Sequence, residues 1–201
     1  MGSFDPIHIG HLFMASEALN KNIVDEVVFV PTFQNPWKPQ STDFWQRCDL
    51  VKMALDSMNN CSISTVESRI SAPFYSYKTL EKLRDVYPTD KLYIIVGADV
   101  ASEIKLWEHG DWILNNFELI IVNRNGIIYD GRVDITDTID VSSTAVREMY
   151  KKGKQVCPLV PAKVDNFIKK YKINTDKFCV QFAGTIGYVF NYKTVIELAK
   201  R

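Results

Sequence analysis

The chain has 201 residues, of which 46% are hydrophobic and 24% charged, a composition typical of a globular protein with one main core. Its 24 lysines and arginines balance 24 aspartates and glutamates, so no positive field favours nucleic acid as a partner. The four cysteines are widely spaced, which argues against a zinc site and a secreted disulfide framework. No apolar run reaches membrane-spanning length and no secretory pattern opens the chain. We expect a cytoplasmic protein without a membrane partner.

Helical and strand patterns alternate along the chain. Spacing predicts a helix from about 10 to 20, followed by the apolar strand "DEVVFVP". Ser41, Thr42 or Asp43 can cap a second helix, after which "CSISTVES" alternates like a strand. The helical "SYKTLEKLRDVY" precedes the apolar run "KLYIIVGAD", and a broken, tryptophan-rich helical stretch precedes "FELIIVNRNG". This order predicts a doubly wound, Rossmann-like α/β fold with a parallel sheet, helices on both faces and ligands at the carboxyl ends of the strands.

The opening "GSFDPIHIGH" has the residues of a phosphate-binding turn. Gly2 permits close backbone approach, and an Asp-Pro pair fixes a turn. Gly10 lets His8 and His11 point into one space where a helix begins, and the positive end of a helix attracts anions. Each histidine could instead be an ordinary hydrogen-bonded surface or core residue. A metal site is disfavoured, because no Asp, Glu or Cys joins the histidines at ligand spacing.

A second candidate anion site is "DVSSTAVREMY". Ser142, Ser143 and Thr144 stand where the next helix should begin, and Arg147 lies one turn further on the same side as Ser143. The plainer interpretation is an N-cap followed by a solvated arginine. The sequence thus predicts two helix N-termini suited to binding an anion in one small α/β chain. Together they favour a nucleotide polyphosphate as ligand.

The segments "HIGH" and "VSSTAVR" resemble the two signature motifs of the nucleotidyltransferase superfamily. The stretches "GSFDPIHIGHL", "NPWKP", "VGADVASEIKLWEHGDWIL" and "FELIIVNRNG" narrow the resemblance to bacterial nicotinate-nucleotide adenylyltransferases, from Gly2 to about Tyr171. Phosphopantetheine adenylyltransferases are also similar, but they generally have Thr where this chain has His8.

The resemblance implies that nicotinate mononucleotide attacks the α-phosphorus of ATP in line and that pyrophosphate leaves, with Mg²⁺ on the phosphates. Because the attacking phosphate is already ionised, this reaction needs positioning and charge stabilisation rather than a general base. By resemblance, the catalytic residues are His8, His11, Lys38 and Arg147; ATP contacts Gly2, Ser3, Phe4, His8, Gly10, His11, Ser142, Ser143 and Arg147; and the acceptor pocket contains Tyr75, Thr79, Asp99, Trp107 and Arg124.

Alternatives stay open at this point. Asp99 ends an apolar strand at the expected ligand edge, whereas a tryptophan such as Trp107 at helical spacing is as readily a core residue. The acceptor could be nicotinamide mononucleotide or phosphopantetheine, or the chain could be an inactive nucleotide-binding regulatory protein. A homo-oligomer is compatible with the sequence.

The two ends of the chain raise a question of domain organisation. We expect a nucleotidyltransferase domain over residues 1–173 and an additional strand, glycine turn and helix over 174–201. The amino-acid sequence of that tail resembles the start of a glycosyltransferase nucleotide-binding domain. No strand precedes Gly2, so we hypothesise that Phe178 to Phe182 pairs into or beside the sheet. The alternative is a boundary artefact, with a truncated start and a foreign tail that packs loosely.

Overall fold

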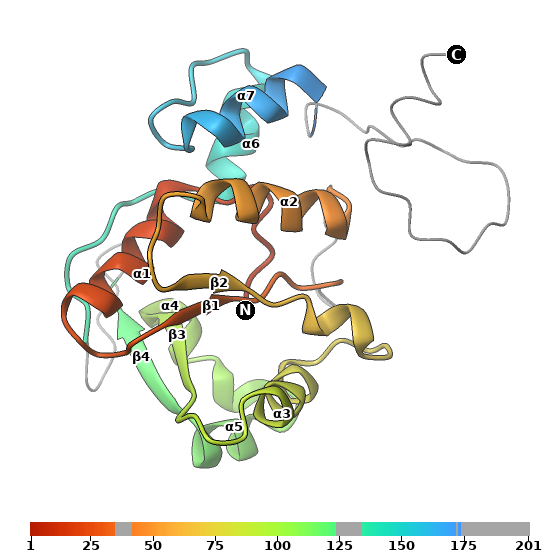
Figure 1. Cartoon of the computed structure of the whole chain (residues 1–201), viewed down its shortest axis with the longest axis vertical. Helices are drawn as coiled ribbons and strands as arrows, with labels where there is room; N and C mark the ends of the chain where they lie inside the picture. Colours follow the sequence, from red (N-terminus) through yellow and green to blue (C-terminus); the bar gives the residue numbers. More distant parts are fainter. Residues whose placement is uncertain (35–41, 124–133, 172, 174–201) are drawn as a thin grey trace, which may run out of the picture.

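The computed structural model describes residues 1–34, 42–123, 134–171 and 173 (Figure 1). Strands and helices alternate as the sequence predicts. The elements are α1 (Ile9–Asn20), β1 (Val27–Phe29), α2 (Phe44–Leu55), β2 (Cys61–Ile63), η1 (Val66–Arg69), α3 (Ser76–Val86), β3 (Tyr93–Gly97), α4 (Ala98–Ala101), η2 (Ile104–Leu106), α5 (Gly110–Asn116), β4 (Glu118–Val122), α6 (Ser143–Lys151) and α7 (Ala162–Tyr171).

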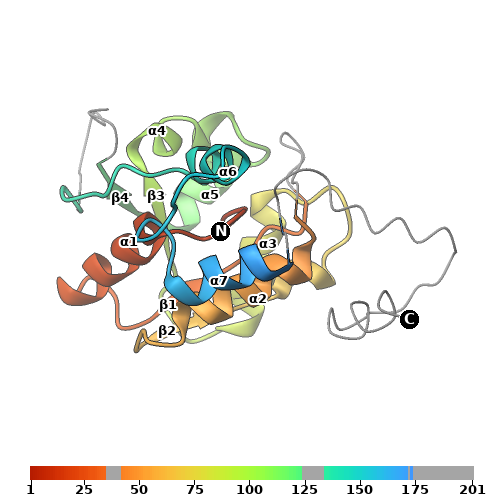
Figure 2. The ribbon, with the colours of Figure 1, turned by 90° about the horizontal axis from the view of Figure 1, so that it is seen from above.

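The strands form two parallel pairs. β1 pairs with β2 in the register Val28 to Ser62, and β3 pairs with β4 in the register Ile95 to Ile120. Helix α2 connects β1 to β2, and the segment from α4 to α5 connects β3 to β4, as parallel pairing requires. Within the described ranges the two pairs are separate sheets, and Figure 2 shows the start of the chain between them.

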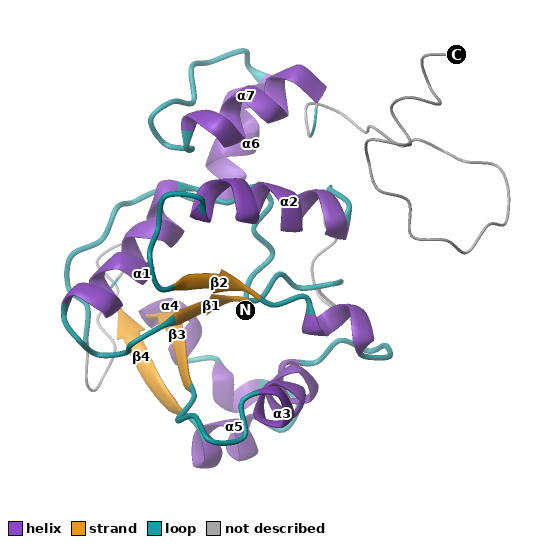
Figure 3. Cartoon of the chain, viewed as in Figure 1, coloured by secondary structure: helices purple, strands orange, loops and turns teal. Residues whose placement is uncertain are grey.

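Period-two alternation along the strands explains why helices cover both faces. Val27 and Phe29 of β1 belong to one apolar cluster, whereas Val28 and Val30 pack into another. The first cluster holds the buried faces of α1, α2, α6 and α7, and the second holds those of α3 and α5. Figure 3 shows α2, α6 and α7 above the strands and α3 and α5 below them. The predicted doubly wound α/β architecture is therefore confirmed.

Helix α2 shows how local sequence sets an element. Asp43 is its N-cap, and Oδ1 of Asp43 accepts hydrogen bonds from the backbone amides of Trp45 (2.8 Å) and Gln46 (3.3 Å). Of the three caps that the sequence offered, Asp43 is the one used. The apolar spacing predicts one face of Phe44, Leu50 or Val51, Ala54, Leu55 and Met58. All of these are buried except Met58, which lies beyond the end of α2 and is half-buried.

The segment "CSISTVES" differs in part from its prediction as a strand. Strand β2 ends at Ile63, and Val66–Arg69 forms a turn of 3₁₀ helix instead. The physical reason is Glu67, whose buried carboxylate accepts hydrogen bonds from Phe33 and Thr79. A continued strand would alternate its side chains across the sheet, whereas the 3₁₀ turn directs this carboxylate towards both donors.

Two expectations fall on undescribed parts of the chain. The predicted strand, turn and helix over 174–201 lie outside the described residues. So does most of "QNPWKPQSTD" and "NGIIYDGR", whose glycines, prolines and polar residues predict long loops. None of the helices in the described ranges is long and apolar enough to cross a lipid bilayer.

Candidate active site

The opening turn begins just past the carboxyl end of β1. The amide of Gly2 donates to the carbonyl oxygen of Val30 (3.0 Å), and the carbonyl of Gly2 accepts from the amide of Thr32 (2.9 Å). These bonds place Gly2 beside Pro31 in parallel orientation. The turn therefore lies at the edge of the sheet where α/β proteins bind ligands.

The two histidines of the turn stack on one another. His8 is the N-cap of α1 and is only 3% exposed, and its ring lies 3.7 Å from that of His11 with an interplanar angle of 24°. The backbone amide of His8 donates to Nδ1 of His11 (3.3 Å). Because Nδ1 accepts a hydrogen bond, a neutral His11 carries its proton on Nε2, as a donor suited to an anion. The expectation that both rings share one space is met by this geometry.

Phe4 holds a strained conformation inside the turn. Its φ of 46° lies in the left-handed region, which costs an L-residue on the order of 1 to 2 kcal/mol. Its ring makes an edge-on contact with His11 at 5.0 Å and packs on Phe29 of β1 at 5.6 Å. Backbone strain that packing enforces is common at ligand-binding sites.

Helix α6 is joined directly to the opening turn. Ser143 Oγ donates to the carbonyl of Pro6 (2.9 Å), and Arg147 Nη1 donates to the carbonyl of Asp5 (2.7 Å). Ser142 is the N-cap of α6, and its hydroxyl accepts from the amide of Ala145 (3.1 Å). The structure thus brings together two motifs that lie some 140 residues apart. The guanidinium of Arg147 is held next to the histidine turn by this bond, and the residue is half-buried.

Gly10 permits the close approach of the two helix starts. A Cβ atom at this position would lie 2.9 Å from Cγ1 of Val141 and 3.1 Å from Nδ1 of His8. A real Cβ essentially never lies as close as 2.9 Å to another atom, and 3.1 Å is tighter than most Cβ contacts. A larger residue would therefore push α1 away from the segment that leads into α6. Gly10 therefore shapes the site through packing.

The carboxyl ends of β3 and β4 add two buried oxygens. Asp99 stands in the first turn of α4, and Asn123 follows directly after β4. Gly97 and Val122 are partners in the ladder, so both side chains follow the same end of the sheet. In the described part of the chain, Oδ1 of Asp99 and Oδ1 of Asn123 are buried without a hydrogen-bond partner. A buried oxygen without a partner is costly, which makes both atoms candidates for ligand contacts. Asn123 was missed by the sequence prediction.

The predicted acceptor residues occupy different environments. Tyr75 is the N-cap residue of α3, and its ring lies 6.3 Å from that of Tyr77, which in turn contacts His109 at 4.3 Å. Trp107 follows η2 and packs, half-buried, against the second apolar cluster. Thr79 is 0% exposed, and its hydroxyl donates to Glu67 (3.0 Å). In this structure its hydroxyl is therefore enclosed and bonded to a buried carboxylate, and it does not face an open acceptor pocket.

Two predicted site residues cannot be placed. Lys38 in "NPWKP" and Arg124 in "VNRNG" lie outside the described residues. No group of three or more His, Cys, Asp or Glu side chains gathers into a metal-binding cluster in the described part of the chain.

Arg47 and Glu67 are two buried charged residues that the sequence prediction missed. Arg47 lies on α2, and its guanidinium donates to backbone carbonyls that include that of Ser3 in the opening turn. Burial lowers the pKa of Arg47, and the nearby carboxylates of Asp5, Asp43 and Glu67 oppose this shift. Burial likewise raises the pKa of Glu67, against the effect of its hydrogen bonds. A signal was present: position 47 lies on the apolar stripe of α2, where an arginine is unusual.

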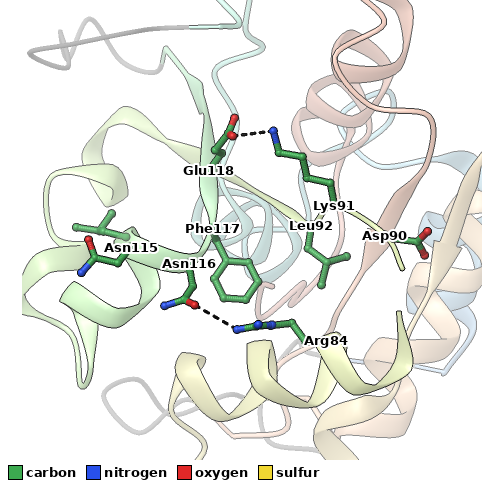
Figure 4. Close-up of a pocket in the computed structure, with 9 residues that line it drawn as sticks. Arg84, Asp90, Lys91, Leu92, Asn115, Asn116, Phe117 and Glu118 are labelled. Carbon is green, nitrogen blue, oxygen red and sulfur yellow. Dashed lines mark hydrogen bonds and ion pairs between the residues drawn. The ribbon is translucent and has the colours of Figure 1, made fainter. Parts of the chain in front are cut away.

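One surface pocket lies away from this site. Figure 4 shows it next to Arg84 of α3 and the start of β4, with a cavity volume of about 320 Å³. Three of its charged side chains have partners: Arg84 donates to Asn116, and Lys91 pairs with Glu118. These residues lie at the amino ends of β3 and β4, whereas the histidine turn follows the carboxyl end of β1, so the pocket is not part of the candidate site.

A parallel α/β sheet, with a histidine turn and the start of a second helix joined at its carboxyl edge, is the arrangement of a nucleotide-binding transferase. The cytidylyltransferase-like family model matches residues 1–149, so the chain belongs to the cytidylyltransferase-like family. Within that class its relatives are nicotinate-nucleotide adenylyltransferases. A probable nicotinate-nucleotide adenylyltransferase from Clostridium tetani is 35% identical over 188 residues, which cover 85% of this chain and 94% of the relative. The Bacillus subtilis nicotinate-nucleotide adenylyltransferase is 33% identical, over 84% of this chain and 93% of the relative.

Solved structures support the same fold. A nicotinic acid mononucleotide adenylyltransferase from Plasmodium falciparum, complexed with NaAD, matches with a TM-score of 0.69 and 19% identity, over 87% of this chain and 97% of that one. A putative nicotinate-nucleotide adenylyltransferase from Vibrio parahaemolyticus matches with a TM-score of 0.66 and 20% identity, over 84% and 95% of the two chains. The predicted resemblance to this enzyme family is confirmed. The prediction that the protein is a nucleotidyltransferase is confirmed with it.

Proposed function

We propose that this protein transfers AMP from ATP to nicotinate mononucleotide, which yields nicotinate adenine dinucleotide and pyrophosphate. One observation carries the proposal: Arg147 and Ser143 of α6 bond to the backbone of the turn that holds His8 and His11. This contact gathers hydrogen-bond donors and two helix starts at the carboxyl edge of the sheet, as a triphosphate requires. The identity with nicotinate-nucleotide adenylyltransferases supports the choice of acceptor.

The chemistry follows from the charges of the two substrates. The 5′-phosphate of nicotinate mononucleotide attacks the α-phosphorus of ATP, the bond to the bridging oxygen breaks, and that oxygen leaves with pyrophosphate. The protein has to align the two phosphates and stabilise the charge that moves onto the leaving group. ATP enters as its magnesium complex, with the ion on phosphate oxygens, which are its usual ligands at such sites.

The residue roles in this reaction are part of the proposal. The Nε2–H of His11 is oriented for donation because Nδ1 is held by the His8 amide. Asp99 is proposed to accept a hydrogen bond from the nucleotide, on the strength of its buried oxygen. We assign catalysis to His8, His11, Lys38 and Arg147, and ATP contacts to these histidines and Arg147 with Gly2, Ser3, Phe4, Gly10, Ser142 and Ser143. The acceptor site is assigned to Tyr75, Asp99, Trp107 and Arg124, with Thr79 bonded to Glu67 rather than exposed to the acceptor.

We infer a cytoplasmic setting in which ATP and nicotinate mononucleotide are the partners, without nucleic acid or membrane. The reaction involves one molecule of each nucleotide and needs no second protein, although a homo-oligomer is compatible with it. Equal numbers of acidic and basic residues fit small-molecule rather than nucleic-acid recognition.

The test offers the protein ATP and Mg²⁺ with one acceptor at a time and measures pyrophosphate. Nicotinate mononucleotide should support release at a far higher kcat/KM than nicotinamide mononucleotide or phosphopantetheine. Preferred turnover of another acceptor would replace the proposed substrate with that acceptor. Binding of ATP without release with any of the three would assign the protein to nucleotide-binding regulators instead.

A further inference from the structure

The guanidinium of Arg47 donates hydrogen bonds to four backbone carbonyls of the described residues, one of them in the opening turn. Its side chain is fully buried at the first turn of α2. The four bonds are from Nη1 to the carbonyl of Ser3 (2.6 Å), from Nη2 to those of Thr32 (2.7 Å) and Phe33 (3.2 Å), and from Nε to that of Thr42 (3.1 Å).

The carbonyls that Arg47 binds belong to different segments at the carboxyl edge. Ser3 belongs to the histidine turn, directly before the strained Phe4. Thr32 and Phe33 follow β1, and Thr42 precedes the N-cap of α2. One guanidinium therefore joins three stretches of backbone that border the nucleotide site.

Glu67 holds one of these stretches from the other side. Its Oε2 accepts from the amide of Phe33 (2.7 Å), while Arg47 binds the carbonyl of the same residue. The ring of Phe33 packs on Phe44 of α2 at 4.8 Å and on Phe74 at 5.0 Å. With its amide, carbonyl and ring all held, Phe33 is a fixed support for the guanidinium.

The geometry requires arginine rather than any cation. A guanidinium is a rigid planar fork of five donors, whereas a lysine ammonium is a compact point charge that cannot reach the same carbonyls together. The bonds described here go to backbone carbonyls, and one of them belongs to Ser3, a proposed ATP contact, so Arg47 would act on the substrate through the turn.

We propose that Arg47 is a positioning residue for adenylyl transfer, because its bonds hold the Ser3 carbonyl of the histidine turn against the segment after β1. The inference rests on the proposed function. Without the hydrogen bonds of the Arg47 guanidinium, the histidine turn could shift. Phe4, His8 and His11 would move with it. A displacement of about 1 Å in such a site can cost about 100-fold in rate.

The kinetic test compares Arg47→Lys with Leu50→Ala, a core substitution on the same helix. Leu50 is buried in the first apolar cluster and makes none of the carbonyl bonds described above. At 10 °C, with folding checked by circular dichroism, Arg47→Lys should lower kcat about 100-fold. Leu50→Ala should reduce the melting temperature but leave kcat within about threefold of wild type. Equal loss of kcat in both variants, or none in Arg47→Lys, would overturn the inference.

A second readout does not depend on turnover. Amide hydrogen exchange of the peptide over residues 2–11 should increase in Arg47→Lys and stay at the wild-type rate in Leu50→Ala. If wild type shows no adenylyl transfer but this difference is found, the proposed function fails while the positioning contact stands. Unchanged exchange in Arg47→Lys contradicts the contact itself.

Arg47→Gln covers the case in which the lysine variant does not fold. The neutral amide of the glutamine side chain keeps two planar N–H donors and buries no charge. Arg47→Gln should therefore retain part of the hydrogen bonding to the backbone carbonyls and lose less activity than Arg47→Lys. Wild-type kcat and exchange in this variant would overturn the inference. Failure of both variants to fold would also overturn it, because Arg47 would then serve the core as a whole and not the turn.

Discussion

The candidate site side chains at the histidine turn form hydrogen bonds to the protein backbone. His11 accepts the His8 amide, Ser143 donates to Pro6, and Arg147 donates to Asp5. Each group thus has one end fixed by the protein, which leaves its orientation largely set before a nucleotide arrives. Such preorganisation is the main contribution expected of a site that performs no covalent chemistry of its own.

Two substitutions at His11 separate its two nitrogens. In His11→Asn the side-chain amide can occupy the place of Nδ1 and accept from His8, whereas in His11→Gln it reaches the place of Nε2. If Nε2–H donates to the phosphates, His11→Asn should lose at least about 100-fold in kcat and His11→Gln clearly less. Steady-state kinetics with both substrates varied would measure this. Equal activity of both variants with wild type would refute the assigned donor.

Candidate site residues could be proposed from short motifs, but their contacts within the fold could not. "HIGH" and "VSSTAVR" each indicate an anion site, whereas the bonds from Ser143 and Arg147 to residues some 140 positions earlier depend on the packed fold. Thr79 illustrates the limit, because nothing in its local sequence indicates that its hydroxyl faces a buried carboxylate. Arg47 was detectable, since it interrupts an apolar stripe.

At the level of elements, the site depends on how closely α1 approaches the segment before α6. Gly10 is the second residue of α1, and Val141 directly precedes the N-cap of α6. Because Gly10 has no Cβ, the start of α1 can lie this close to the segment before α6. The lack of a side chain at Gly10 therefore determines the spacing of the two helix starts. The capping residues then fix where each helix begins.

A substitution pair tests this spacing. Gly10→Ala should destabilise the fold by about 1 to 3 kcal/mol through overpacking, and raise the KM for ATP. Val141→Ala removes the Cγ1 atom that the new Cβ would meet at 2.9 Å. The double variant should therefore recover much of the loss, giving a favourable coupling energy in a double-mutant cycle from urea unfolding. Simple additivity of the two changes would show that the contact does not set the spacing.

For the whole molecule, the predicted order of strands and helices is confirmed because it follows from patterns of apolar residues alone. The sequence could not reveal how the strands group. In the described chain β1 pairs only with β2 and β3 only with β4. Because Val27 and Phe29 bond to β2, the backbone groups of Val28 turn to the opposite edge, where Gly2 already bonds to Val30. That edge is where a further strand could pair.

The pairing of Phe178 to Phe182 with the sheet stays a prediction, because these residues lie outside the described ranges. Removal of residues 174–201 should lower the free energy of unfolding and broaden the transition if this segment covers an open strand edge. Urea unfolding followed by circular dichroism and tryptophan fluorescence would measure both effects. Unchanged stability would mean that the tail packs loosely and contributes nothing to the sheet.

The fate of the α-phosphate decides whether the protein is an adenylyltransferase. ATP labelled at the α-phosphorus is incubated with Mg²⁺, nicotinate mononucleotide and the protein, and the products are separated and identified by mass. The label should appear in nicotinate adenine dinucleotide, with one pyrophosphate formed for each dinucleotide. Label that remains in ATP, or appears in ADP together with inorganic phosphate, would contradict the proposed reaction.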